Sequence, residues 1–439
     1  MRKLTVKNFS VIKEAELEFG KITVLIGPPS SGKSLLCKLA YFLGKELIDL
    51  AVTSVANRDG WNAYVEFAAR EFSQRFTNYS VDDWVGIPHR ITFTSFRYQI
   101  ALRWEDDPDL LSFAFSDAFR DQYLKLLDDL YGNPPTASGA IYPGGLNPSL
   151  RRYDIWFAFS QITSDIVPDQ TVYIPAGRAF FTNTPKGFAL LQNPGIDSIT
   201  REFATQIQWE SRWKVGLLTS GRGVTDEISR SMTDVSQGFV LVDSGVPLFL
   251  AKDGRKLPLE IISTGVQELV PLFNVVEQLM YLREHSFEYS RANFDPPRVD
   301  RAIASKPLVY VEEPEANVFP ATQYQLVRLF SWLSADPILD FSWVITTHSP
   351  YVLSSFNNLL EAWQVGHIDE EHAKAVRETI GEKYWLNPDE FRAYAIKDGV
   401  LSSIVADDTK LISENYLDSV SETIGAEFDE LLRIGYVEA

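Results

Sequence analysis

The sequence predicts an α/β fold built around a phosphate-binding loop, and three observations carry this prediction. Residues 27–34 read Gly-Pro-Pro-Ser-Ser-Gly-Lys-Ser, the G-x-x-x-x-G-K-S pattern of such loops. The apolar run 22–26 before the loop predicts a buried strand, and the apolar segment 35–43 after it predicts a helix. Two later apolar strands, 308–311 and 343–345, each end in side chains that can act on a phosphate.

The loop has a defined chemistry. Its backbone N–H groups surround the β-phosphate of a nucleotide, and the N-terminus of the following helix directs partial positive charge at it. We expect Lys33 to reach the β- and γ-oxygens and the Ser34 hydroxyl to ligate Mg²⁺. The strand and the helix that flank the loop favour this interpretation over a glycine-rich turn with an exposed lysine. The residues expected to contact ATP here are Gly27, Ser30, Ser31, Gly32, Lys33, Ser34 and Leu35.

Composition limits the class of protein. The 439 residues allow two or three domain-sized units, and 45% hydrophobic residues supply a packed core. The formal net charge of −18 weighs against a large DNA-binding surface on this chain. No apolar run approaches the roughly 20 residues of a membrane helix, and the N-terminus lacks a signal-peptide pattern. Cys37 is the only cysteine and falls in the helix after the loop, so we expect packing there and a cytoplasmic protein.

The remaining elements are predicted in order from periodicity and turn residues. Alternation predicts strands, and helical spacing predicts helices. The N-terminal half is expected to hold strands within 3–26, a helical region from 35 to about 80, a hairpin of 90–96 with 98–104, helices at 105–130 and 150–165 around a loop at 131–149, and a strand at 171–174. The C-terminal half is expected to hold strands within 238–262, helices that begin at Ser263, Pro320 and Ser349-Pro350, a loop at 295–297, a hairpin around 397–399 and an acidic helical tail.

Two adjacent glutamates follow the strand 308–311. A carboxylate at the end of a strand beside the loop is a suitable oxygen ligand for Mg²⁺ or its waters, and we assign Glu312 to the metal. The neighbouring carboxylate can face the γ-phosphate and polarise water, so we assign Glu313 as the catalytic base. The alternative, two solvated glutamates in a surface turn, is disfavoured by the apolar strand directly upstream.

Two further positions complete the expected site. His348 follows the strand 343–345, and a neutral imidazole there can hydrogen-bond the γ-phosphate and hold the attacking water. Ser263 and Gly265 lie at a helix start, where a hydroxyl, free N–H groups and the helix dipole favour an anion. Taken alone, His348 is more readily a structural histidine, and Ser263 is more readily an ordinary helix cap. Their order along the chain, after the phosphate loop and with the glutamate pair, favours a functional role.

That order resembles the ABC-type ATPases, which include transporter cassettes and the SMC, RecF, Rad50 and OLD branches. Gly27–Ser34 resembles Walker A, Ser263–Gln267 the signature motif, Leu308–Glu313 Walker B, Pro314–Phe319 the D-loop, and His348 the switch histidine. Within the superfamily, Glu-Glu-Pro-Glu-Ala-Asn-Val-Phe-Pro, Thr-Thr-His-Ser-Pro-Tyr and Tyr-Ile-Pro-Ala-Gly-Arg resemble the OLD/AAA-15 type of prokaryotic ATPase.

The resemblance implies ATP and Mg²⁺ as ligands and a homodimer, alone or within a higher oligomer, that sandwiches two ATPs. Ser263 and Gly265 would then act in trans. The resemblance also implies an ATPase head with a mixed central sheet, an antiparallel β subdomain and a helical insertion. The expected parts are the head with Walker A at 1–60, the insertion at 61–237, the head with the later motifs at 238–365, and a C-terminal hairpin with an acidic helical cap at 366–439.

Three positions depart from the family pattern. Glu312 stands where transporter cassettes usually have aspartate, and Val266 stands where the signature often has glutamine, with Gln267 one residue later. The Q-loop glutamine has no clear counterpart. Arg178 follows the strand 171–174, near the place where the Q-loop glutamine would be expected. The alternative interpretation of Arg178 is a surface ion pair that contributes little to stability.

The expected function is an ATPase whose nucleotide-driven dimerisation controls a separate effector, such as a nuclease or toxin, in phage defence. The alternative is a DNA-repair ATPase of RecF or Rad50 type, disfavoured by the acidic charge and the absence of sustained heptads. A transporter subunit is disfavoured by the long insertion. No intrinsic nuclease is expected, since Asp407-Asp408 and Asp429-Glu430 do not follow apolar strands.

Overall fold

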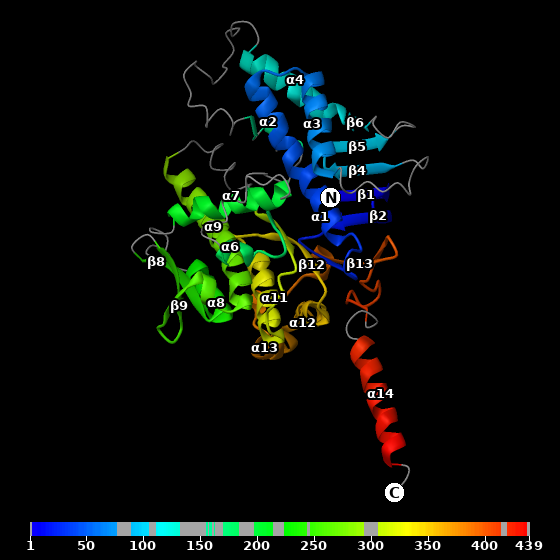
Figure 1. Cartoon of the computed structure of the whole chain (residues 1–439), viewed down its shortest axis with the longest axis vertical. Helices are drawn as coiled ribbons and strands as arrows, with labels where there is room; N and C mark the ends of the chain where they lie inside the picture. Colours follow the sequence, from blue (N-terminus) through cyan, green and yellow to red (C-terminus); the bar gives the residue numbers. More distant parts are fainter. Residues whose placement is uncertain are drawn as a thin grey trace.

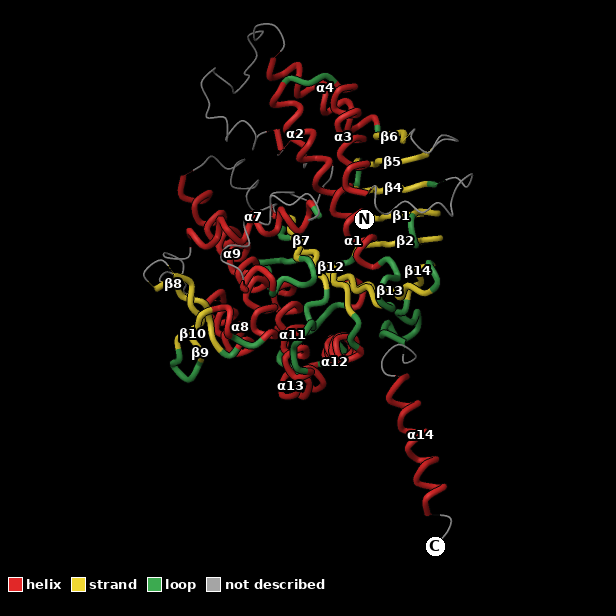
Figure 2. The backbone as a smooth tube through the Cα atoms, in the orientation of Figure 1, coloured by secondary structure: helices red, strands yellow, loops and turns green. Residues whose placement is uncertain are grey.

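The computed structural model describes most of the chain as a mixed α/β structure (Figures 1 and 2). The predicted α/β class, a mixed central sheet with a separate antiparallel β unit and helices, is confirmed. The predicted loops at 132–149 and 295–297 and most of the predicted helix at 150–165 lie outside the described residues. The structure describes residues 2–76, 89–104, 111–131, 155–156, 158–159, 162, 170–183, 197–213, 224–243, 246–293, 306–413 and 419–436.

Eleven strands of the described chain form one sheet, and five of them are consecutive and parallel. The full order is β6-β5-β4-β1-β2-β14-β13-β3-β12-β11-β7. The run from β13 to β7 is parallel throughout. Its interior strands are apolar on both faces, as helices on both sides require. The parallel strands are β3 (Ile22–Ile26), β7 (Thr171–Ile174), β11 (Leu308–Glu312), β12 (Ser342–Thr347) and β13 (Phe391–Lys397).

The other end of the sheet is antiparallel and corrects one prediction. Residues 111–115, expected within a helix, form edge strand β6, and the helix begins only at Asp117. Leu111, Phe113 and Phe115 alternate onto the core, which is strand rather than helix periodicity. The remaining strands of the sheet are β1 (Arg2–Phe9), β2 (Ile12–Phe19), β4 (Arg90–Ser95), β5 (Tyr98–Trp104), β6 (Leu111–Phe115) and β14 (Val400–Ser403).

Helices cover the two faces of the sheet and form two large apolar cores (Figure 1). The helical region predicted from residue 35 divides into α1, a π-helical turn, α2 and α3; α2 stops where Arg58 adopts φ 68°. The described helices on the first core are α1 (Lys33–Tyr41), the π-helix Phe42–Glu46, α2 (Leu47–Asn57), α3 (Trp61–Phe76) and α4 (Asp117–Tyr131). Those on the second include α8 (Val224–Ser236), α9 (Thr264–Asn293), α11 (Pro320–Ala335) and α12 (Pro350–Gly366).

Smaller elements complete the described chain. A three-stranded antiparallel sheet joins β8 (Gly238–Asp243), β9 (Val246–Ala251) and β10 (Lys256–Pro258). The C-terminal helix α14 (Ser419–Tyr436) extends away from the rest of the molecule (Figure 1). No helix within the described ranges is both long and apolar enough to span a membrane. The other short elements are α6 (Phe180–Asn183), α7 (Ser198–Trp213), α13 (Glu370–Thr379) and the 3₁₀ turns Leu259–Ile261, Glu382–Tyr384 and Pro388–Glu390.

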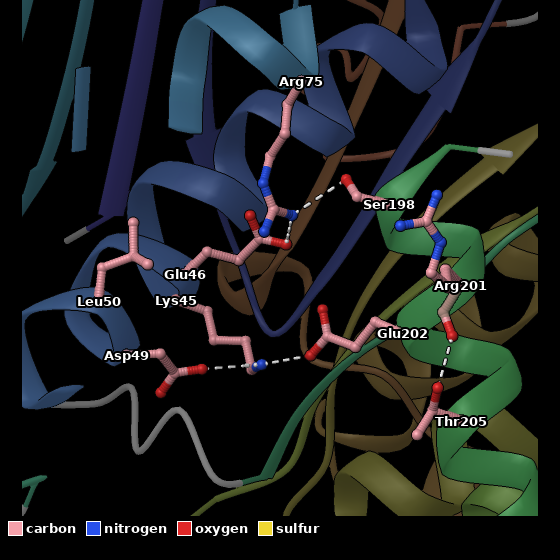
Figure 3. A pocket seen from close by; sticks show the side chains of 9 residues that line it. All are labelled: Lys45, Glu46, Asp49, Leu50, Arg75, Ser198, Arg201, Glu202 and Thr205. Atoms are coloured by element: carbon pink, nitrogen blue, oxygen red, sulfur yellow. Dashed lines mark hydrogen bonds and ion pairs between the residues drawn. The ribbon is translucent and has the colours of Figure 1, made fainter. Parts of the chain in front are cut away.

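A charged pocket of about 350 Å³ lies where α7 meets the helices that follow the phosphate loop (Figure 3). Lys45 Nζ contacts Asp49 Oδ2 at 3.0 Å and Glu202 Oε1 at 2.6 Å. Arg75 Nη1 contacts Glu46 Oε1 at 2.5 Å. Burial raises the pKa of Glu46 to about 8, although the neighbouring Arg75 opposes the rise. The Lys45–Glu202 ion pair and a hydrogen bond from Arg75 Nη1 to the Ser198 hydroxyl at 3.1 Å attach α7 to the N-terminal part of the chain.

Candidate nucleotide-binding site

Parallel strand order brings the predicted site residues to one edge of the sheet. β3, β12 and β11 are neighbours, and the loop that follows each leaves the sheet at the same side. The phosphate loop follows β3, His348 follows β12, and Glu312 and Glu313 lie at the end of β11. Residues that are 279 (312 − 33) and 315 (348 − 33) positions apart in the chain thus lie at the same edge.

The phosphate loop has the cradle that its sequence predicts. Gly32 adopts φ 105°, and a Cβ there would lie 2.3 Å from Ile12 Cδ1. A Cβ on Gly27 would lie 2.7 Å from the backbone oxygen of Ile396. Both positions therefore require glycine. The Ser31 hydroxyl is buried in the loop without a hydrogen-bond partner, so it can hydrogen-bond a ligand that binds there.

Lys33 lies buried within a group of carboxylates. In this conformation its Nζ donates to the backbone oxygens of Gly27 and Pro28, each at 2.8 Å. Burial lowers the pKa of Lys33, while the nearby charges of Glu313, Glu315 and Glu312 oppose that shift. Ser34 is half-buried and Leu35 is buried, while Ser30 is exposed at the loop tip with φ 60°.

Glu312 is buried and already hydrogen-bonded by the protein. Its Oε1 accepts from the Tyr173 hydroxyl at 2.5 Å, and its Oε2 accepts from the Ala176 N–H at 3.0 Å. Each carboxylate oxygen retains one further lone pair, so Glu312 can still accept from a metal-bound water. The hydrogen bonds from Tyr173 and Ala176 fix the orientation of the Glu312 carboxylate. Sequence reasoning missed the roles of Tyr173 and Ala176, because β7 and the loop after it lie far from Glu312 in the chain.

Glu313 is held in an uncommon backbone conformation and points to His348. Its φ is 44°, in the left-handed region, which costs a non-glycine residue about 1–3 kcal/mol. Its N–H donates to the Thr346 backbone oxygen at 2.9 Å, and its Oε1 lies 3.3 Å from His348 Nε2. Both side chains remain about a third exposed and are accessible to a substrate. Strain at such a position is typical of functional sites.

Glu315 joins the site although sequence reasoning gave it no role of its own. Its Oε1 accepts from the Thr347 hydroxyl at 2.6 Å and from the His348 N–H at 2.7 Å. It thereby ties the turn after β11 to the start of the loop that carries His348. Ser349 is the N-cap residue of α12, with Pro350 as the first helical residue as predicted, but its hydroxyl donates to Gln323 Oε1 at 2.5 Å and not to the helix.

Arg178 is fully buried, so the surface ion-pair interpretation is wrong. Its guanidinium donates to the backbone oxygens of Glu312 at 2.8 Å and Glu313 at 3.1 Å. It also donates to the backbone oxygens of Pro175 at 3.3 Å and Glu268 at 2.9 Å. Burial lowers the pKa of Arg178, and the charge of Glu268 makes the largest opposing contribution.

Ser263 and Gly265 lie at the start of α9. Ser263 is exposed, and its backbone oxygen accepts from the Gln267 N–H at 2.9 Å. A Cβ on Gly265 would lie 2.6 Å from the Asn317 backbone oxygen, so this helix start packs closely on the turn after β11. Gln267 is buried and its side chain donates to the backbone oxygens of Leu259 and Glu260, which occupies it within the chain.

The fold and the site define a P-loop ATPase. A family model described as "AAA domain, putative AbiEii toxin, Type IV TA system" matches residues 22–354, about three quarters of the chain. The chain therefore belongs to this family, and its recognition as a P-loop ATPase is confirmed. No curated protein matches the chain.

Solved structures of two SMC head domains and of one ATP-binding cassette are similar to this chain at low identity. The SMC head domain of Thermotoga maritima is 11% identical, with a TM-score of 0.38. The match covers 92% of this chain and 97% of that one. The Smc head domain of Pyrococcus furiosus, bound to the C-terminal domain of ScpA, is 12% identical with a TM-score of 0.38, covering 92% of this chain and 96% of that one. MJ1267, an ATP-binding cassette of an ABC transporter, is 10% identical with a TM-score of 0.32, covering 96% of each chain.

Proposed function

We propose that this chain binds and hydrolyses ATP and that two copies close around the nucleotide to control a separate effector protein. One observation carries the proposal: the phosphate loop, the Glu312-Glu313 pair and His348 meet at one edge of the sheet. Membership of an ATPase family and the buried Ser31 hydroxyl without a partner support it.

In the proposed reaction, water attacks the γ-phosphate and the bond between the γ-phosphorus and the oxygen of ADP breaks. Glu313 accepts the proton of that water, and His348 Nε2 holds the γ-phosphate or the water. Lys33 leaves the carbonyls of Gly27 and Pro28 and neutralises charge on the β- and γ-oxygens.

The residues present fit a magnesium ion bound with the nucleotide. Mg²⁺ keeps several waters and takes few protein ligands, and here the Ser34 hydroxyl and a lone pair of Glu312 would hold it. When bound, the ion neutralises phosphate charge. The described residues contain no group of three or more His, Cys, Asp or Glu side chains that could hold a metal without the nucleotide.

A mixing experiment tests whether Ser263 and Gly265 act in trans. Lys33→Ala removes the phosphate contact of one copy, and Ser263→Arg blocks the exposed helix start of the other. Each variant alone should be inactive. Their mixture should recover about a quarter of wild-type turnover, because half of the two-fold dimers are mixed and each has one intact site. No recovery after subunit exchange, verified by native mass spectrometry, would contradict trans action.

We further propose that α14 is where the effector docks. Phe428, Leu431 and Leu432 are exposed on this helix, next to the acidic Glu427 and Glu430. An exposed apolar stripe beside negative charge fits a partner with an apolar groove edged by lysine or arginine. α14 projects away from the rest of the molecule (Figure 1), and the three apolar side chains are 40% or more exposed.

Deletion of residues 419–439 tests this docking site. The deletion should leave ATP turnover within about two-fold, because α14 makes no part of the nucleotide site. It should abolish co-purification with the products of neighbouring genes, while Phe428→Ala combined with Leu431→Ala should weaken it. A deleted chain that still captures the same partner would assign docking elsewhere.

A further inference from the structure

We infer that Arg178 positions the catalytic carboxylate and links it to the start of α9. The inference rests on the proposed function and assigns a role that neither the motifs nor the family description provides. It starts from a fully buried cation whose hydrogen bonds go to backbone oxygens of three separate elements. Such a group fixes the relative position of the elements it joins.

Glu313 depends on this contact for its direction. Its N–H is held by the Thr346 backbone oxygen, and its own backbone oxygen is held by Arg178 Nη2 at 3.1 Å. Both sides of a residue in the left-handed region are therefore clamped. Without Arg178 the Glu313 backbone oxygen keeps only the neutral hydrogen bond from the Ala316 N–H at 3.0 Å, which is weaker than one from a guanidinium. The backbone of Glu313 is then held less firmly, and its carboxylate is less well directed at His348 Nε2.

The same guanidinium contacts the helix that begins at Ser263. Its Nε donates to the Glu268 backbone oxygen at 2.9 Å and lies 3.6 Å from Glu268 Oε2. Glu268 is buried and lies in the second turn of α9, one turn after the exposed helix start. A shift of that helix start on contact with a second copy would therefore be transmitted through Arg178 to Glu313. The coupling would make hydrolysis depend on dimer closure.

Arg178→Lys tests the role because it keeps the charge but cannot reach four acceptors. Turnover should fall about 10²-fold, the effect of a misplaced catalytic group. Affinity for a fluorescent ATP analogue should stay within about three-fold, because the four hydrogen bonds of Arg178 go to backbone oxygens outside the phosphate loop. Arg377→Lys, the same substitution at an exposed ion pair of α13, is the matched control and should change neither quantity.

The decisive readout is non-additivity with Glu313→Gln. If Arg178 acts through Glu313, then Arg178→Lys should lower turnover in the wild-type background but not further in the Glu313→Gln background. A purely structural residue would lower turnover equally in both. Glu268→Gln, which removes the charge partner and keeps the guanidinium, should show the same pattern with a smaller loss, and it decides the matter if Arg178→Lys does not fold.

The outcomes separate this inference from the proposed function. A wild-type chain without ATP turnover, or a Glu313→Gln chain with full turnover, would overturn the proposed function itself. Normal turnover in both Arg178→Lys and Glu268→Gln, or additive losses, would overturn only the role of Arg178.

Discussion

Glu313→Gln should lower ATP turnover by about 10²–10⁴-fold while ATP binding is retained, since this is the usual contribution of a general base. The amide keeps the size of the side chain and can still hydrogen-bond His348 Nε2, but it cannot take the proton of the attacking water. The variant should therefore hold unhydrolysed ATP and accumulate as a dimer. Turnover of radiolabelled ATP and light scattering with and without Mg-ATP measure both effects.

Glu371→Gln is the control for this variant, because Glu371 is an exposed glutamate on α13. It should leave turnover and dimerisation unchanged. A Glu313→Gln chain that hydrolyses ATP at the wild-type rate would show that another group accepts the proton, and Glu315 would be the next to test. Its buried Oε2 has no hydrogen-bond partner, and its charge acts on Lys33.

The sequence predicts the parallel core and its site because both depend on local patterns. Short apolar strands followed by glycine, glutamate or histidine place chemical groups at strand ends, and parallel pairing then collects those ends at one edge. Local patterns also give the two hairpin strands at 90–104. They fail at β6, where a strand of alternating aromatic residues directly precedes α4 and its apolar content fits either period.

The rest of the site depends on pairing across the fold. Tyr173 and Arg178 act on Glu312 and Glu313 because β7 lies beside β11, and no pattern in 130 intervening residues specifies that neighbour. Burial of Arg178 could not be read from its sequence, since an arginine after a strand is usually exposed. The left-handed φ of Glu313 is likewise a property of its tertiary hydrogen bonds.

The division into four parts, with boundaries at 60, 237 and 365, stays a prediction. Strands from 90–115, which fall in the predicted insertion, extend the sheet of the first part.

Lys33→Ala should remove both ATP binding and turnover, with kcat/KM lower by about 10²–10³-fold, the loss typical of one preorganised charge contact. The charges of Glu312, Glu313 and Glu315 act on Lys33, so its removal takes one of two nearby cations from these carboxylates and leaves only Arg178. Those carboxylates would then repel the triphosphate, and this is why the loss should appear in affinity as well as in rate. Isothermal titration with ATP and a phosphate-release assay measure the two parts.

Lys374→Ala, at an exposed lysine of α13, is the matched control and should bind and hydrolyse ATP normally. Combining Lys33→Ala with Glu313→Gln provides a further check on the electrostatic argument. Removing one of the repelling carboxylates should restore part of the lost ATP affinity but none of the turnover, because the base is gone as well. If the double variant binds ATP no better than Lys33→Ala, repulsion by Glu313 is not part of the cause, and the loss belongs to the missing contact between Lys33 and the phosphate alone.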